Sequence, residues 1–516
     1  MAAWIKAMES AALPADGMRR VEIEGVPILI VHSSGRIRAF TGDCPHAGAP
    51  FDQGALCEGR IVCPWHKAAF AIDDGRWLEP PALEGLLSYP VRVENNGVFV
   101  ELEPKRLHKP HVTRANAGSA RRLAIVGGGA AGAAAAATLL EGDFDGEVTM
   151  FAAESQAPYD RTCLSKFVPA GEMAPSDVPP ILPEGVARDP RLRIDHTEVK
   201  RFDVPTKRVT LADGREFAFD TVLIASGSVA RRPDVPGAGL GHVFTLRSVD
   251  DAAAILHALS PGEHAVILGD SFIGLETASA LRKRGVEVTI AAPGGLPLQR
   301  PLGARVGALF REWHEANGVV FRHAKALRFE GSREVEAVAL DDGATLPAKA
   351  VIAGIGVRPA THFVSGIPLD EDGGVTVDAA MRAGRGVYAV GDIARFPLNG
   401  TGATPQKTRI EHWRVAQQQA RIAALNMLGE DTRYDGVPFF WTEHYDKRCD
   451  YLGHVEHWDD LAISGRPGDD RFVVLYSRLG RLRAVLACGC EHEMALLSER
   501  MREPLSTDSA RAILGL

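Results

Sequence analysis

The chain has 516 residues and a mass of 55.3 kDa, too long for one hydrophobic core, and this length predicts roughly three to five domains. Hydrophobic residues make up 46% and charged residues 24%, as in ordinary globular proteins, which excludes collagen-like and wholly disordered chains. The 58 Lys and Arg against 66 Asp and Glu leave a net charge of −8, which argues against nucleic acid or anionic lipid as a partner.

The seven cysteines are an odd number at low density, which indicates a reducing compartment rather than a disulfide scaffold. The first residues show no basic region followed by an apolar core, so no targeting signal is predicted. Residues 123–140 carry no charge and approach the length of a membrane span. Their glycines and alanines instead favour a buried strand, a glycine turn and a tightly packed helix. We expect a cytoplasmic protein without a membrane span.

The pattern of apolar and polar residues changes several times along the chain. Short alternating apolar segments up to residue 103, with turn signals at Ser34-Gly35 and Asn96-Gly97, predict a small antiparallel β domain. Residues 104–118 are polar, basic and aperiodic, as in a linker. From Arg121 strands alternate with helical stretches, which predicts a parallel sheet with crossover helices. After about residue 434 the pattern becomes aromatic-rich and strand-like, then helical, which predicts an α+β unit.

Two segments of the chain share the same pattern of a strand followed by a glycine-containing turn. A strand and the turn Gly127-Gly-Gly129-Ala-Ala-Gly132 parallel a second strand and the turn Gly269-Asp-Ser271-Phe-Ile-Gly274. A further strand follows each turn at a similar distance. This pattern predicts two nucleotide-binding βαβ units in one chain.

The N-terminal domain contains a possible metal centre in Cys44-Pro-His46 and Cys63-Pro-Trp-His66. Each loop contributes one thiolate and one imidazole, so both cysteines can hold one iron and both histidines the other, as a Rieske 2Fe–2S centre requires. Two Cys and two His can also hold zinc, although zinc pairs more often keep like ligands together. In the zinc alternative, the N-terminal domain is a zinc-stabilised interaction module.

Over about residues 5–103 the sequence resembles the Rieske ferredoxin family, in its dioxygenase-type rather than its respiratory form. Respiratory members add a cysteine to each loop, and the matching positions here are Ala49 and Trp65. The resemblance also implies that Ala68 replaces a hydroxyl that bonds a bridging sulfide. Fewer hydrogen bonds to sulfur predict a reduction potential near the low end of the Rieske range.

The first glycine motif predicts a flavin adenine dinucleotide site. Its glycines allow pyrophosphate to approach a helix N-terminus, and Glu154 is placed to accept from ribose hydroxyls. Together with residues 158–166, 221–227 and 386–392, the motif resembles the two-dinucleotide-binding flavoprotein reductases, whose fold is glutathione-reductase-like. The likeness extends over 121–516 and is greatest to ferredoxin reductases of oxygenase systems and to the apoptosis-inducing-factor-like branch with an N-terminal Rieske domain.

The resemblance implies contacts to the flavin dinucleotide at several positions of this chain. Besides Gly127, Gly129, Gly132 and Glu154, they are Arg161 and Lys166 against the flavin, Val199 at the adenine, Gly227, Gly391, Asp392 at the ribityl chain, and Glu411 and Trp413 at the isoalloxazine ring.

The second glycine motif is predicted to bind the nicotinamide dinucleotide. The family likeness implies Gly269, Ser271 and Gly274 at the pyrophosphate, Glu276 near the nicotinamide carboxamide, and Gly356 in a closing glycine motif. No acidic residue follows the strand ending near residue 290 to bond a ribose 2′-hydroxyl, and the nearest arginine for a 2′-phosphate is Arg300. NADH or NADPH could serve, and the family likeness favours NADH.

The remaining cysteines carry no predicted redox role. Related flavoproteins reduce disulfides through a C-x4-C pair, but Val168 stands five residues after Cys163. Cys57 is interpreted as a packed or surface thiol, and Cys488-Gly-Cys490 as incidental. With Cys449, four cysteines are therefore expected to be bystanders.

The predicted domains are residues 1–103 (Rieske), 104–118 (linker), 119–235 and 357–432 (the two parts of a FAD-binding domain), 236–356 (NAD(P)-binding) and 433–516 (C-terminal reductase domain). Electrons are expected to pass from NAD(P)H through FAD to the 2Fe–2S cluster and on to an oxygenase, a haem monooxygenase, a ferredoxin or a quinone. A homo-oligomer is compatible with this prediction. The alternative is a redox-sensing flavoprotein of the apoptosis-inducing-factor type with slow turnover.

Overall fold

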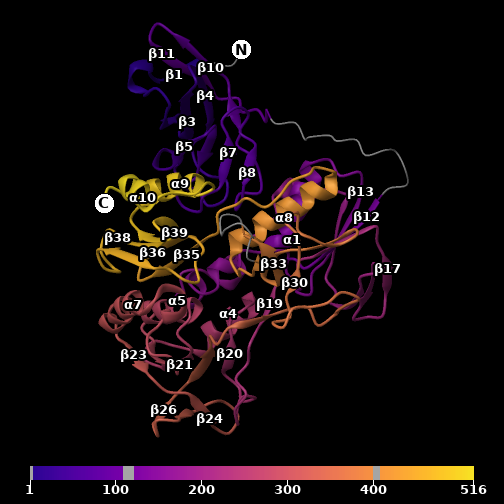
Figure 1. The fold of residues 1–516 in the computed structure, drawn as a ribbon, viewed down its shortest axis with the longest axis vertical. Helices are drawn as coiled ribbons and strands as arrows, with labels where there is room; N and C mark the ends of the chain where they lie inside the picture. Colours follow the sequence, from indigo (N-terminus) through magenta and orange to yellow (C-terminus); the bar gives the residue numbers. More distant parts are fainter. Residues whose placement is uncertain (1–3, 108–120, 399–406) are drawn as a thin grey trace.

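The computed structural model describes residues 4–107, 121–398 and 407–516, so most of the predicted linker lies outside the described residues. The described chain forms an N-terminal β domain, two α/β domains and a C-terminal α+β domain (Figure 1), which confirms the predicted fold class. In Figure 1 the β domain lies above helices α9 and α10. The C-terminal sheet lies between it and the domain that carries α5 and α7.

The N-terminal domain consists of small antiparallel sheets. Its turn at Ser34-Gly35 has the positive φ angles that a tight hairpin needs, and β3 contributes a fully buried run of aliphatic residues. The sheets are β1 (Trp4–Glu9), β11 (Gly97–Glu101) and β10 (Val91–Glu94); β2 (Gly17–Ile23), β3 (Val26–Ser33), β4 (Arg36–Thr41) and β9 (Ser88–Tyr89); and β5 (Ala55–Cys57), β6 (Arg60–Val62), β7 (Ala69–Ala71) and β8 (Trp77–Glu79).

The first α/β domain is built on a six-stranded sheet that is parallel apart from one edge. Two of its strands come from a segment that follows the second α/β domain, so the domain is split in sequence. In spatial order the strands are β14 (Leu192–Asp195), β13 (Gly146–Phe151), β12 (Arg121–Val126), β18 (Thr221–Ile224), β32 (Val387–Ala389) and the antiparallel β31 (Arg382–Gly384).

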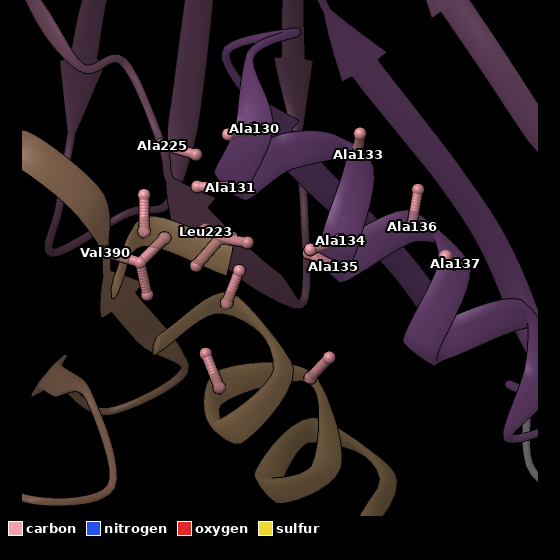
Figure 2. Packing of buried hydrophobic residues seen from close by; sticks show 14 of the residues in the cluster. Ala130, Ala131, Ala133, Ala134, Ala135, Ala136, Ala137, Leu223, Ala225 and Val390 are labelled. Carbon is pink, nitrogen blue, oxygen red and sulfur yellow. The ribbon is translucent and has the colours of Figure 1, made fainter. Parts of the chain in front are cut away.

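Helix α1 (Ala130–Glu141) packs on α8 (Trp413–Leu428), and Figure 2 shows the small side chains along this contact. The alanines of α1 are almost completely buried, and methyl groups alone allow two helices to approach closely. The uncharged stretch at residues 123–140 is therefore a strand, a glycine turn and a buried helix, as predicted. None of the described helices is long and apolar enough to cross a membrane.

Smaller elements surround this sheet. They are β15 (Val199–Asp203), β16 (Arg208–Leu211), β17 (Glu216–Ala218) and β29 (Val364–Ser365); β19 (Ser228–Ala230) and β28 (Val357–Pro359); β30 (Val375–Thr376), β33 (Ala394–Pro397) and β34 (Lys407–Thr408); and the short helices α2 (Phe167–Ala170) and α3 (Glu184–Ala187).

The second α/β domain has a parallel five-stranded sheet, with a small antiparallel sheet beside it. The parallel order is β20 (Val243–Thr245), β27 (Ala350–Ala353), β21 (His264–Leu268), β22 (Glu287–Ala291) and β23 (Val319–Arg322), and the small sheet is β24 (Ala326–Glu330), β25 (Ala337–Leu340) and β26 (Thr345–Pro347). The helices are α4 (Val249–Ala258), α5 (Phe272–Lys283), α6 (Gln299–Leu302) and α7 (Ala304–Ala316).

The C-terminal domain is an antiparallel sheet covered by two helices. The strands are β35 (Phe439–His444), β36 (Lys447–Gly453), β39 (Arg481–Cys488), β38 (Phe472–Arg478) and β37 (Asp460–Ser464), and the helices are α9 (Glu491–Arg500) and α10 (Thr507–Leu514). The strand and helix pattern predicted after residue 434 is confirmed.

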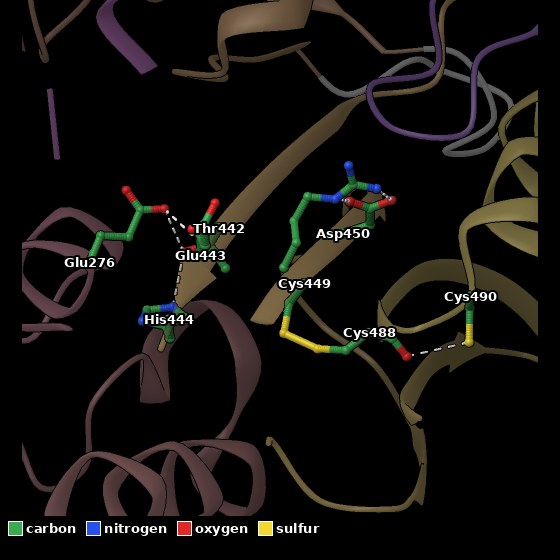
Figure 3. The surroundings of a disulfide bond; sticks show 9 residues. Glu276, Thr442, Glu443, His444, Cys449, Asp450, Cys488 and Cys490 are labelled. Atoms are coloured by element: carbon green, nitrogen blue, oxygen red, sulfur yellow. Dashed lines mark hydrogen bonds and ion pairs between the residues drawn. A yellow bond between two sulfur atoms is a disulfide. The ribbon is translucent and has the colours of Figure 1, made fainter. Parts of the chain in front are cut away.

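One expectation about the cysteines is wrong. Cys449 and Cys488 stand opposite each other in the register of β36 and β39, and they form a disulfide (Figure 3). Two of the four expected bystanders are therefore paired, because strand pairing joins positions 39 residues apart that no spacing rule connects. Cys490 stays a free thiol and donates to the carbonyl of Cys488 at 3.6 Å.

Candidate functional site

The two loops of the predicted metal centre have the same backbone closure. The N–H of Cys44 donates to the carbonyl of Ala49 and the N–H of Cys63 to the carbonyl of Ala68, each at 2.8 Å. These bonds turn each loop back on itself, so that its cysteine and histidine face the opposite loop.

The four predicted ligands meet in pairs of like type. The Nδ1 atoms of His46 and His66 are 3.1 Å apart, and the thiols of Cys44 and Cys63 are close enough to interact. Burial lowers the pKa of both imidazoles, which favours the neutral form that binds metal. Within the described residues, no three His, Cys, Asp or Glu converge on a single ion position. A two-plus-two arrangement fits a 2Fe–2S cluster better than one tetrahedral zinc.

A tryptophan of the C-terminal domain covers the histidine side of this centre. The ring centroids of Trp441 and His66 are 4.1 Å apart, and Nζ of Lys166 lies 6.0 Å from the Trp441 ring. Trp441 is therefore near both a predicted cluster ligand and a residue predicted to lie against the flavin. It was not predicted as a site residue, and its only signal was the aromatic character of residues 438–441.

A buried ion pair holds the N-terminal domain in this position. Nζ of Lys67, the residue after His66, lies 2.8 Å from the carboxylate of Asp450 on β36. Both side chains are almost completely buried. Loss of either partner of such a buried pair destabilises the fold, because the remaining charge stays desolvated without its counter-ion.

Helix α8 contributes a second anchor. The fully buried Arg414 donates from Nη2 to the carbonyl of Lys67 at 2.8 Å and from Nε to that of Pro80 at 2.9 Å. Glu79 accepts from Gln418 at 2.7 Å and pairs with Arg502 at 2.5 Å. Main-chain groups of the β domain are thus bound by side chains of the reductase portion of the same chain.

The first glycine motif forms a cradle at the start of α1. A Cβ on Gly127 would lie 2.2 Å from the carbonyl oxygen of Ala225, and one on Gly132 would lie 2.0 Å from that of Gly127. Gly129 faces open space, where a Cβ would meet nothing within 4 Å. The cradle has the shape that pyrophosphate needs at a helix N-terminus, so these residues fit FAD.

Other predicted flavin residues have protein partners in the structure. Arg161 pairs with Glu154 and donates to the carbonyl of Arg247 at 2.8 Å. Asp392 accepts from Ser228 at 2.6 Å and from Arg247 at 2.9 Å. These bonds fix the orientation of the side chains, and their contacts with FAD stay predictions.

The remaining flavin positions are distributed around the same domain. Val199 is buried at the start of β15, Gly227 has a positive φ beside Arg247, and Glu411 pairs with Arg409 next to Trp413, which begins α8. Gly391 also has a positive φ, and its N–H donates to the side chain of Gln419 at 2.7 Å.

The structure brings Glu276 and Lys166 together, although 110 residues separate them. The buried carboxylate of Glu276 accepts from Lys166 at 3.1 Å and from Ser165 at 2.6 Å. The predicted nicotinamide residue and the predicted flavin residue are thus direct partners.

The second glycine motif is packed like the first. A Cβ on Gly269 would lie 2.5 Å from the carbonyl oxygen of Gly354, and one on Gly274 would lie 2.6 Å from that of Gly269. Ser271 is the N-cap of α5 and its hydroxyl accepts from the N–H of Gly274 at 3.4 Å. This capping role explains the serine at a glycine position. Gly356 faces open space with a positive φ.

The cysteine after the first motif, Cys163, is a free, buried thiol. Burial raises its pKa to about 12, which disfavours the nucleophilic thiolate form. The expected absence of dithiol chemistry stays a prediction.

Comparison with known families agrees with this geometry. Residues 121–420 match the family described as pyridine nucleotide-disulphide oxidoreductase, residues 3–90 the Rieske [2Fe-2S] domain and residues 439–513 the reductase C-terminal domain. The chain belongs to the pyridine nucleotide-disulphide oxidoreductase family. The family implies FAD and NAD(P)H, and the Rieske domain implies a 2Fe–2S cluster. The protein is an NAD(P)H-dependent oxidoreductase that transfers electrons.

Individual relatives share either the whole arrangement or the reductase portion. Apoptosis-inducing factor 3 of Mus musculus is 32% identical, over 93% of this chain and 81% of the relative. The ferredoxin–NAD(+) reductase component of the biphenyl dioxygenase system of Paraburkholderia xenovorans (strain LB400) is 34% identical, over 72% of this chain and 91% of the relative. A covalent putidaredoxin reductase–putidaredoxin complex is 27% identical with a TM-score of 0.71, over 76% of this chain and 96% of that chain.

Proposed function

We propose that this protein passes electrons from NADH through FAD to the Rieske cluster of the same chain, and from there to a separate acceptor. The contact that carries the proposal is the tilted ring contact of Trp441 with His66, with Lys166 near the same indole. Donor site, flavin site and cluster loops are parts of one folded unit, joined through β35.

Bound FAD supplies the conversion of a two-electron donor into single electrons, which a 2Fe–2S cluster can accept. The residues of this chain position the groups. Glu276 and Lys166 form a buried pair at the predicted nicotinamide and flavin sites, and no general acid or base is needed for hydride transfer. Trp441 places an aromatic ring against His66, near Lys166 of the predicted flavin site.

The choice of donor and acceptor belongs to the proposal. NADH is favoured because several relatives are named ferredoxin–NAD(+) reductases, whereas the residues directly after β22 include neither an acidic residue for a 2′-hydroxyl nor an arginine for a 2′-phosphate. The acceptor is an oxygenase, a haem monooxygenase or a ferredoxin, in keeping with the dioxygenase systems named for several relatives. The proposal keeps the predicted cytoplasmic location. A homo-oligomer stays a prediction.

Anaerobic stopped-flow reduction by NADH tests the internal transfer. In the wild type, bleaching of the oxidised-flavin absorbance is expected to be followed by bleaching of the cluster bands. In Cys63→Ala the flavin should still bleach and the cluster phase should be absent. If the wild-type cluster stays oxidised after the flavin is reduced, transfer within the chain is wrong.

Two simple measurements separate the alternatives. Iron analysis and the visible spectrum of the purified protein distinguish a 2Fe–2S cluster from zinc. Steady-state NADH oxidation with an artificial one-electron acceptor distinguishes an electron-transfer enzyme from a redox sensor, which is expected to turn over very slowly. The likeness to apoptosis-inducing factor 3 makes this second measurement necessary.

A further inference from the structure

A buried chain of polar side chains leads from Glu276 into the C-terminal domain. Oε1 of Glu276 accepts from the hydroxyl of Thr442 at 2.7 Å, and that hydroxyl lies 3.0 Å from Nε2 of His444. Figure 3 shows the carboxylate facing Thr442 and the ring of His444 following it along β35. Thr442 and His444 are both fully buried.

The chain continues to a second buried histidine. The ring of His314, on α7, lies edge to face with that of His444 at a centroid distance of 5.1 Å. Nδ1 of His314 is 2.8 Å from the hydroxyl of Tyr445, which is only partly buried. The sequence of contacts therefore runs from the Lys166–Glu276 pair to a side chain at the surface.

The second ring nitrogens of the two imidazoles have different surroundings. Nε2 of His314 is buried and has no hydrogen bond within the described ranges, whereas the His444 ring has the main chain of Leu275 beside it. A buried nitrogen without a partner costs free energy, so a structural role alone does not account for His314. A water or a transferred proton is a partner that such a nitrogen can take.

The surroundings keep both rings neutral. Burial lowers the pKa of His444 to about 3, with a smaller contribution from the charge of Lys166, and burial also lowers the pKa of His314. The rings face the aromatic side chains of Phe310 and Trp313. The charged and titratable groups of the neighbouring elements are Lys166, Glu276, Glu443 and Tyr445. A neutral imidazole can accept a proton on one nitrogen and release one from the other.

The reaction requires such a route. Oxidation of one NADH to NAD⁺ by two one-electron carriers releases two electrons and one proton, and the carriers take only the electrons. For each NADH, one proton must therefore leave the site that contains Glu276 and Lys166. Both of these side chains are buried beneath the C-terminal domain.

We propose that Thr442, His444, His314 and Tyr445 form the exit route for this proton. The inference rests on the proposed function, because the proton arises only if NADH is oxidised at this site. A proton received by Glu276 passes through the Thr442 hydroxyl to Nε2 of His444, while His444 releases a proton from Nδ1 toward Nε2 of His314. His314 then releases one from Nδ1 through Tyr445 to water. Ring rotation or one bridging water closes the gap between the rings. The transfer restores the number of protons on every group but reverses the tautomer of each imidazole, and rotation of each ring restores the initial tautomer before the next proton.

The test follows proton release separately from electron transfer. Holoenzyme in weak buffer is mixed anaerobically with NADH and ferricyanide, a one-electron acceptor, in the presence of a pH indicator dye. The variants are Thr442→Val, which removes the hydroxyl and keeps the shape, Thr442→Ser, which keeps the hydroxyl, and Tyr445→Phe. Nitrogen NMR of the histidine rings reports their protonation and tautomers without turnover.

Thr442→Val is expected to slow proton release about tenfold or more relative to Thr442→Ser. Tyr445→Phe should delay proton release while the flavin is reduced at the wild-type rate. The His444 ring signals should change in Thr442→Val and stay wild-type in Thr442→Ser. Proton release at the wild-type rate in both Thr442→Val and Tyr445→Phe would overturn the route. Failure of the cluster to be reduced in the wild type contradicts the proposed function instead, because ferricyanide makes the proton measurement independent of the cluster.

Discussion

The indole of Trp441 lies on the imidazole of His66, with ring centroids 4.1 Å apart and 42° between the ring planes. One residue belongs to the C-terminal domain and the other to the N-terminal β domain. The contact exists only because the β domain is docked on the reductase portion of the chain. Electron transfer within the molecule therefore depends on the same interactions that hold the domains together.

Replacement of Trp441 is expected to affect transfer to the cluster more than reduction of the flavin. Trp441→Ala opens a space beside His66, and we expect the cluster phase to slow about tenfold, equivalent to about 1.4 kcal/mol of barrier. Trp441→Phe keeps an aromatic ring and should retain most of the rate. Stopped-flow spectra resolve the two phases, and the cluster potential should stay unchanged. Equal slowing of both phases in Trp441→Ala would show a general disturbance of the flavin site.

Glu79 should make the free energy of unfolding depend on pH in a defined direction. Burial alone would raise its pKa, but Arg414 and Arg502 outweigh burial and lower the pKa from 4.5 to about 2. The ionised carboxylate thus stabilises the folded state above pH 4.5, and this contribution is lost as the pH falls toward 2. We expect Glu79→Gln to lose about 3 kcal/mol of unfolding free energy at pH 7.

The difference between Glu79→Gln and wild type should shrink once the pH falls below 4.5, as measured by urea unfolding from pH 7 to pH 3. Glu443 is a matched control of opposite sign, because burial raises its pKa. Glu443→Gln should therefore not destabilise the protein at pH 7 in the way that Glu79→Gln does. A constant loss for Glu79→Gln at every pH would exclude the carboxylate charge as the cause.

The stability of the domain contact should depend strongly on the Lys67–Asp450 pair. Asp450→Asn leaves the ammonium of Lys67 buried without its carboxylate, and we expect a loss of about 3–5 kcal/mol. The unfolding midpoint of the N-terminal domain, followed by cluster absorbance in urea, measures this loss. Lys67→Met with Asp450→Leu should recover part of it. As a control, Asp213→Asn removes one of the two carboxylate partners of the partly exposed Arg215, which keeps Asp195, and should change little.

The Cys449–Cys488 disulfide should stabilise the C-terminal domain. It closes a loop between positions 39 residues apart, for which the entropy of the unfolded chain predicts about 3–4 kcal/mol. Cys449→Ala/Cys488→Ala should lower the urea midpoint of this domain, and a reducing agent should lower the wild-type midpoint equally. Cys490→Ser, which removes a free thiol, is the control. Insensitivity of the wild type to reductant would mean that the disulfide does not contribute.

Local signals in the sequence were sufficient for the domain types and the cofactor motifs. Cys44, His46, Cys63 and His66 stand at fixed spacings because each loop must present two ligands over a few residues. Glycine is required at positions 127, 132, 269 and 274 because a Cβ atom at each would collide with the carbonyl oxygen of a neighbouring main-chain segment. Such constraints act over short stretches of chain and are visible without a structure.

Tertiary structure alone decided which distant residues meet. Trp441 on His66, Asp450 on Lys67, Cys449 with Cys488 and Thr442 on Glu276 each join segments that no spacing relates. These contacts arise from strand register in the C-terminal sheet and from the docking of one domain on another. Both are set by the burial of apolar surface from distant parts of the chain, and not by the residues of one motif. The sequence by itself determined which cofactors the protein can hold. The packing of its domains decided how electrons, and in our proposal protons, can pass between them.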